Sequence, residues 1–278
     1  MSQENEMSFL QHLEVLRWHL MRSIIAILVF AILAFIFKDI IFDQIILAPK
    51  TPKFFTNRIL CEFGKLVNTE SLCINQVEID MINIKLAGQF STHISVSLVA
   101  GFLLSFPYVF FEFWRFVMPA LTKKERSNSR GTVFFTSVLF TLGALFGYYI
   151  IVPLSLHFLG SYSVSTAIEN KIGLDSYIET ITMATLSSAV VFELPIFIFF
   201  LTKIGLVTPS TLKKYRKHAI VIILIIAAVI TPPDVFSQIL VSVPLIILYE
   251  VGIKISKRVI RKQAALLAEE ERLMNLRN

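Results

Sequence analysis

The sequence predicts an all-α integral membrane protein with six transmembrane helices. Hydrophobic residues make up 55% of the 278 positions and charged residues only 17%, whereas a soluble domain is about 45–50% apolar and about 25% charged. The mean hydropathy is +0.71. A membrane helix needs about 20 mostly apolar residues to cross hydrocarbon about 30 Å thick, and the chain contains several such segments. This composition excludes a disordered chain and argues against a soluble enzyme.

Six apolar segments are candidate spans. In chain order they cover residues 20–37, 94–111, 133–159, 178–201, 219–231 and 235–253. The fifth is short, because only 13 residues separate His218 from Pro232, so we expect local bilayer thinning or a shifted depth there. Pro107 and Pro153 lie near span ends, where a missing backbone donor is best tolerated.

The distribution of basic residues predicts the orientation. With six spans, 19 of the 26 Lys and Arg residues lie on the side of both termini and seven lie on the other side. Cytoplasmic segments carry the excess of Lys and Arg, so both termini are expected in the cytoplasm. The net charge of +6 is therefore topological and requires no nucleic acid.

Two segments outside the spans have distinct compositions. Residues 38–90 form the long outer link, which is moderately apolar and balanced in charge, so we expect an ordered periplasmic cap. Both cysteines, Cys61 and Cys73, lie in it; an oxidising periplasm permits a disulfide between them, and two buried thiols are the alternative. Residues 254–278 form a basic cytoplasmic tail that suits lipid headgroups or a partner.

No catalytic motif is visible in the chain. Nucleotide-binding glycine patterns, metal-ligand spacings and nucleophile motifs are missing from the sequence, so neither an enzyme nor a cofactor is expected. The informative residues are carboxylates in unusual places. Glu193 lies deep in the fourth span, where a charge costs about 3 kcal/mol or more. It is therefore either a functional group facing protein or water, or a protonated glutamate hydrogen-bonded to a Ser or Thr on a neighbouring helix.

Other carboxylates have simpler explanations from the residues alone. Glu250 precedes Lys254 by one helical turn, which favours a local ion pair. Asp234 is placed to cap the last span, with or without a further function, and Gln238 follows one turn later. Glu125 lies in a strongly basic link and Glu14 lies three residues before Arg17, so both fit solvated ion-pair partners.

Four segments in this order resemble the TatC family, the core component of the twin-arginine protein translocase. They are HLEVLR at 12–17, PALTKKER at 119–126, FELP at 192–195 and TPPDVFSQ at 231–238. The resemblance covers nearly the whole chain. It implies a concave, glove-like bundle in the bacterial cytoplasmic membrane that acts in an oligomeric complex.

The resemblance also implies a function. Such a protein receives signal peptides with paired arginines and works with TatA-like and TatB-like single-span proteins. Together they export folded cargo, driven by the proton-motive force.

The resemblance assigns roles to individual residues. Glu125 matches the carboxylate that receives a signal-peptide arginine, which suits the bidentate pairing of guanidinium with carboxylate. Leu121 and Phe116 match apolar positions around that site. Positions linked to transport or partner docking are matched by Pro49, Glu193, Asp234 and Gln238.

The amino-terminal motif departs from the family pattern. HLxELR usually carries Glu two residues before the Arg, but here that position is Val15 and the carboxylate is Glu14, one residue earlier. One residue turns a helical side chain by about 100°. Either Glu14 reaches round to the signal peptide together with Arg17, or Glu125 carries more of the recognition alone.

Two other functions compete with this interpretation. A proton-coupled secondary transporter for a small solute would explain Glu193 at membrane depth, although the chain lacks the inverted repeat typical of such proteins. A passive membrane scaffold would explain the basic, helix-forming tail.

Overall fold

The computed structural model describes residues 9–66, 68, 73–74, 81–117, 129–165, 170–231 and 235–276. Five of its helical stretches are long and apolar enough to cross a membrane. They cover Leu13–Ile36, Gly88–Val117, Gly131–Ser161, Leu174–Lys203 and Ser237–Asn275. The all-helical membrane architecture expected from the composition is confirmed for this part of the chain.

The long helices are α1 (Phe9–Ile36), α3 (Gly88–Val117), α5 (Ser129–Phe146), α7 (Leu174–Phe192) and α11 (Val235–Asn275). Two of the spans are interrupted. A π-helical turn, η5 (Gly147–Ile151), joins α5 to α6 (Val152–Ser161), and Glu193 separates α7 from α8 (Leu194–Lys203). Pro153 and Pro195 stand in the first turns of α6 and α8, where a helix loses no hydrogen bond to the missing N–H.

The fifth expected span corresponds to α10 (Arg216–Ile230), which follows the short helix α9 (Pro209–Lys214). With 15 residues, α10 extends about 22 Å, less than the hydrocarbon thickness of about 30 Å. It is not one of the five long apolar helices, so the count of six spans stays a prediction.

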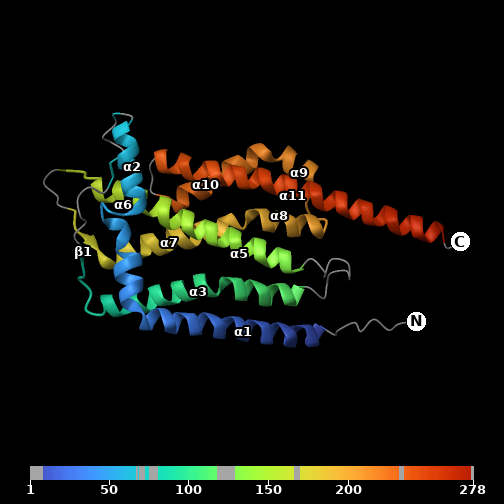
Figure 1. Ribbon diagram of the computed structural model, residues 1–278, viewed down its shortest axis with the longest axis horizontal. Coiled ribbons are helices and arrows are strands. Elements are labelled where there is room, and N and C mark those ends of the chain that lie inside the picture. Colours follow the sequence, from blue (N-terminus) through green and yellow to red (C-terminus); the bar gives the residue numbers. More distant parts are fainter. Residues whose placement is uncertain are drawn as a thin grey trace.

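The helices lie roughly side by side in one layered bundle (Figure 1). Helix α1 packs along α3, which contacts α5 and α7, and α7 adjoins α10 and α11; α8 packs against α11. The first turns of α1 and the last turns of α11 lie at the same end of the bundle. We refer to this end as the inner end and to the opposite end, where α2 and β1 lie, as the outer end.

Small residues set the distances between the helices. A Cβ added at Gly101 of α3 would lie 2.7 Å from the Ala31 nitrogen of α1, and one at Gly147 would lie 2.8 Å from the Ala184 oxygen of α7. Lipid tails are as apolar as the side chains, so helices in a membrane associate through close packing rather than through hydrophobic burial. These glycines therefore allow the close backbone contacts that hold α1 to α3 and the α5–η5 span to α7.

The outer link folds into short elements. They are η1 (Ile40–Ile46, π-helical), η2 (Ala48–Lys50, 3₁₀), α2 (Phe55–Leu66) and β1 (Met81–Ile82). Strand β1 pairs in parallel with β2 (Ile172–Gly173), and Lys85 Nζ lies 2.6 Å from Asp175 Oδ2 beside it. The hydrogen bond to Asp175 raises the pKa of the exposed Lys85.

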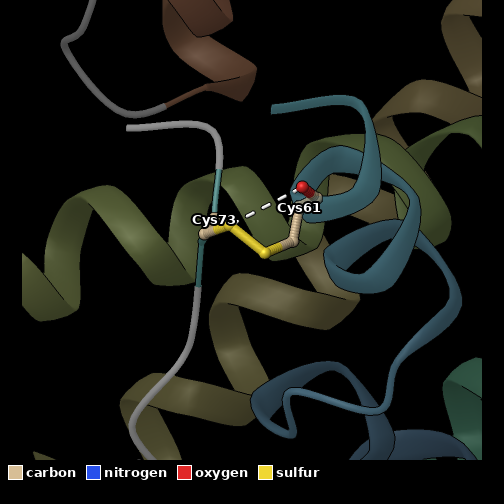
Figure 2. Close-up of a disulfide and its surroundings, with 2 residues drawn as sticks. All are labelled: Cys61 and Cys73. Atoms are coloured by element: carbon tan, nitrogen blue, oxygen red, sulfur yellow. Dashed lines mark hydrogen bonds between the residues drawn. A yellow bond between two sulfur atoms is a disulfide. The ribbon is translucent and has the colours of Figure 1, made fainter. Parts of the chain in front are cut away.

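A disulfide joins Cys61 of α2 to Cys73 (Figure 2). Because Cys73 belongs to the segment that leads toward β1, the bridge fastens α2 to that segment at the outer end.

We predict that Gly101→Leu destabilises the bundle. The new side chain would collide with the α1 backbone, and overpacking of this kind costs about 1–3 kcal/mol. The expected result is a lower thermal unfolding midpoint of the purified protein in detergent. Gly131→Leu is the matched control, since an added Cβ at Gly131 meets no atom of the described residues within 4 Å. An equal loss of stability in both variants would contradict the packing role of Gly101.

Candidate functional site

The inner ends of α1 and α3 carry several of the predicted site residues. Glu14 and Arg17 are exposed in the first turns of α1, and Phe116 lies in the last turn of α3. The two helices meet through His19, whose ring centroid is 6.2 Å from that of Phe116 in an edge-on contact. None of the ion pairs among the described residues joins Glu14 to Arg17.

Three predicted site residues lie outside the described residues. Glu125 and Leu121 belong to the segment 118–128, which follows α3 and precedes α5, and Asp234 belongs to 232–234, just before α11. The last turn of α3 and the first turn of α5, between which residues 118–128 stand in the sequence, lie at the inner end (Figure 1). Their roles stay predictions.

His19 lies on the face of α1 that meets α3, and Val15 stands one turn before it on the helix. Residues four apart on a helix are separated by about 40°, whereas Glu14 and His19, five apart, are separated by about 140°. Val15 is half-buried and Glu14 is exposed. Glu14 therefore does not share the face where the family pattern places its carboxylate.

Glu112 is a carboxylate at this contact that the sequence interpretation missed. The predicted second span stops at Phe111 and leaves Glu112 in the following link, but α3 continues to Val117 and buries Glu112 to 1% exposure. Its Oε2 lies 2.5 Å from His19 Nδ1 and 3.8 Å from an Arg22 nitrogen, and its Oε1 lies 3.6 Å from an Arg115 nitrogen. An acidic residue inside the aromatic run from Phe110 to Phe116 was the available signal for a buried group.

Glu193 occupies the break between α7 and α8. Both of its carboxyl oxygens are buried, and neither has a hydrogen-bond partner among the described residues. The Ser or Thr hydrogen bond considered for a protonated glutamate does not form: Thr182 donates to the Ile178 carbonyl, and the buried Thr185 hydroxyl is itself unpaired. A buried carboxyl group without partners is costly in a bilayer and marks a candidate contact for another polar group.

Pro49 is buried at the outer end, and its position has a structural explanation. A helix would use the N–H of residue 49 to bond the Ile45 carbonyl, but proline has no N–H. The Tyr148 hydroxyl donates to that carbonyl at 2.6 Å, and the Tyr177 hydroxyl donates to the Ile46 carbonyl at 2.8 Å. Pro49 thus leaves the Ile45 carbonyl free for Tyr148 of η5, and Tyr177 of α7 holds the next carbonyl, so both bonds tie the outer elements to the bundle.

Gln238 and Glu250 both connect α11 to α10. Gln238 Nε2 donates to the Leu224 carbonyl at 3.2 Å. The expected ion pair of Glu250 with Lys254 is wrong, because Arg216 Nε lies 2.7 Å from Glu250 Oε1. Helix α10 begins with this arginine and packs beside α11, so a partner from another helix replaces the local one.

The structure brings only part of the predicted set together. Phe116 lies at the α1–α3 contact with the amino-terminal helix, while Glu193, Gln238 and Pro49 belong to other parts of the bundle. The described residues contain no group of three His, Cys, Asp or Glu side chains that could hold a metal ion.

The chain is similar to known proteins over most of its length. The family model for Sec-independent protein translocase protein (TatC) matches residues 11–244. A TatC protein from Blattabacterium sp. subsp. Periplaneta americana is 42% identical over 264 residues, which cover 94% of this chain and 99% of the relative. A TatC protein from Aquifex aeolicus is 31% identical over 258 residues, which cover 92% and 98%.

Solved structures agree with these relatives. A crystal structure described as the twin arginine translocase receptor TatC in DDM superposes with a TM-score of 0.67 at 32% identity, covering 88% of this chain and 99% of that one. A second crystal structure of a twin arginine translocase receptor TatC gives 0.63 at 31% identity, covering 90% and 99%.

We predict that Glu193→Leu raises the stability of the isolated protein. Leucine removes a buried, unpaired carboxyl group whose desolvation costs about 1–3 kcal/mol. The thermal unfolding midpoint in detergent should rise by a few degrees. Glu179→Leu is the control, because Glu179 is exposed on the same helix and its replacement should change little. A lower midpoint for Glu193→Leu would refute the assignment of Glu193 as an unsatisfied group.

Proposed function

Because the chain belongs to the TatC family of Sec-independent protein translocase proteins, we propose that it is the signal-peptide receptor and core of a twin-arginine translocase. In this proposal it lies in the bacterial cytoplasmic membrane with six spans and both termini in the cytoplasm. It binds signal peptides that carry paired arginines and passes folded cargo outward with the proton-motive force. It acts as a transport component rather than an enzyme.

The observation that carries the receptor role is the likeness to two solved structures described as twin arginine translocase receptors, which extends over about nine-tenths of this chain. The PALTKKER segment follows α3 in the sequence, and Glu125 stands among basic residues there. A carboxylate in such surroundings selects a guanidinium that forms two parallel hydrogen bonds over the point charge of lysine. This selectivity would explain a requirement for arginine.

The proposal also assigns the steps after signal-peptide binding, namely partner docking and transport, to residues away from the signal-peptide site. TatA-like and TatB-like single-span proteins are the expected partners in an oligomeric complex. Glu193 is the best candidate contact, since its unpaired carboxyl group would gain a hydrogen bond from a polar side chain on a partner's membrane helix. Asp234, Gln238 and Pro49 are assigned to docking or transport on the family pattern alone. A small-solute transporter is not retained, because membership of a protein translocase family accounts for the chain.

We predict that Glu125→Lys weakens binding of a twin-arginine signal peptide more than Glu14→Ala does. The lysine would repel the peptide arginines, whereas Glu14 does not face the α1–α3 contact. Fluorescence anisotropy of a labelled peptide with the full chain in nanodiscs measures both, with a twin-lysine peptide as the control. Equal affinities of the two variants would refute the ranking, and equal binding of both peptides to the unaltered chain would refute the receptor role.

We predict that Glu193→Ala retains signal-peptide binding but loses export. Its carboxyl group lies within the membrane-spanning part, away from the inner-end residues, so its removal affects assembly or transport. Export of a folded twin-arginine reporter in cells, compared with peptide binding by the same variant, tests this. Loss of peptide binding in Glu193→Ala would contradict the division of roles, and normal export would remove Glu193 from the mechanism.

A further inference from the structure

Glu112 is nearly inaccessible and is surrounded by positive side chains. Its side chain is 2% exposed, yet it lies at the inner end of α3, only five residues before that helix ends. His19 Nδ1 lies 2.5 Å from Oε2, and Arg22 and Arg115 approach one oxygen each. Glu112 is therefore a buried carboxyl group bordered by basic side chains from both α1 and α3.

The position of Glu112 compensates for the departure in the amino-terminal motif. The family pattern places a carboxylate at the position of Val15, and Val15 shares its face of α1 with His19, one turn later. Because His19 contacts Glu112 at 2.5 Å, α3 supplies a carboxylate to the same face from the opposite helix. Phe116, one turn after Glu112, flanks the pair with its ring.

The two arginines cover Glu112 loosely. Their nitrogens lie 3.8 Å and 3.6 Å from the carboxyl oxygens, beyond ordinary hydrogen-bond distance, and their side chains are 49% and 46% exposed. Neither arginine makes an ordinary hydrogen bond to the carboxylate, so moving either side chain into solvent breaks none. An incoming guanidinium that forms two parallel hydrogen bonds with the carboxylate would therefore replace either arginine at little cost.

We propose that Glu112 is a second guanidinium-binding carboxylate of the signal-peptide site and that Arg22 and Arg115 are internal place-holders for the peptide arginines. An arriving arginine displaces one of them, and the released side chain moves into solvent. Charge is balanced throughout, since one guanidinium replaces another. This inference rests on the receptor role proposed above and adds to it a residue that the family pattern does not assign.

The test measures the affinity of a twin-arginine peptide for the full chain in nanodiscs. Replacing Glu112 and replacing either arginine should change this affinity in opposite directions. Glu112→Gln removes the acceptor charge and should weaken binding about tenfold, the equivalent of about 1.4 kcal/mol. Arg22→Gln and Arg115→Gln remove competitors and should each tighten binding about threefold. In the double variant Glu112→Gln, Arg115→Gln the gain should vanish, because the carboxylate that the arginine competes for is gone.

Glu62→Gln is the matched control, because Glu62 is exposed on α2 at the outer end and its replacement should leave the affinity unchanged. A purely structural ion-pair cluster predicts weaker or unchanged binding in the arginine variants, and either result would overturn the place-holder assignment. If Glu112→Gln does not fold, the two exposed arginine variants decide the question by themselves.

The result also separates this inference from the proposed function. If the unaltered chain prefers arginine over lysine and responds to Glu125→Lys, but binds equally well with Glu112→Gln, only the role of Glu112 fails. If the unaltered chain shows no preference for arginine, the receptor role fails and the role of Glu112 fails with it.

Discussion

Hydrocarbon offers no hydrogen-bond partner, so the chain has to satisfy its own polar groups wherever it crosses the membrane. The helices satisfy most of the backbone, and several hydroxyl groups donate to a carbonyl one turn earlier, as Ser137 does to Val133 and Ser242 does to Gln238. Where Pro49 removes a backbone donor, Tyr148 replaces it across a distance of about one hundred residues in sequence. The attachment of the outer elements to the bundle follows from this requirement.

The same requirement separates two buried carboxylates. Glu112 is bordered by His19, Arg22 and Arg115 and also interacts with the Tyr108 hydroxyl, so this buried carboxyl group has polar partners at the end of a span. Glu193 has no partner among the described residues and lies where the fourth span changes from α7 to α8. Glu112 already has partners within the chain, which fits the exchange of one guanidinium for another. Glu193 lacks a hydrogen-bond partner, which fits a contact with a helix of another protein.

Close packing between helices is the second physical requirement that shapes the bundle. Without a hydrophobic driving force between helices in lipid, contact depends on how near two backbones approach. Gly101 brings α3 against α1, and this contact places His19 beside Glu112 at the inner end. Helix packing and the geometry of the inner site are thus two consequences of one interface.

The composition and the apolar segments determined the all-helical membrane class from the sequence alone, because bilayer thickness and charge cost act on local composition. Four ordered motifs indicated the family. Glu193 was found from sequence for the same reason: a carboxylate inside an apolar segment needs no neighbour to be recognised.

Other features depended on contacts between helices. The Glu250 partner was mispredicted as Lys254 because local spacing cannot reveal that α10 brings Arg216 closer. Glu112 was passed over because a residue at the end of an apolar run fits a solvated link equally well in sequence. Only the packing of α1 on α3 decided that Glu112 is buried among His19, Arg22 and Arg115. His19 and Arg22 are about ninety positions away in the sequence, whereas Arg115 is on the same helix as Glu112.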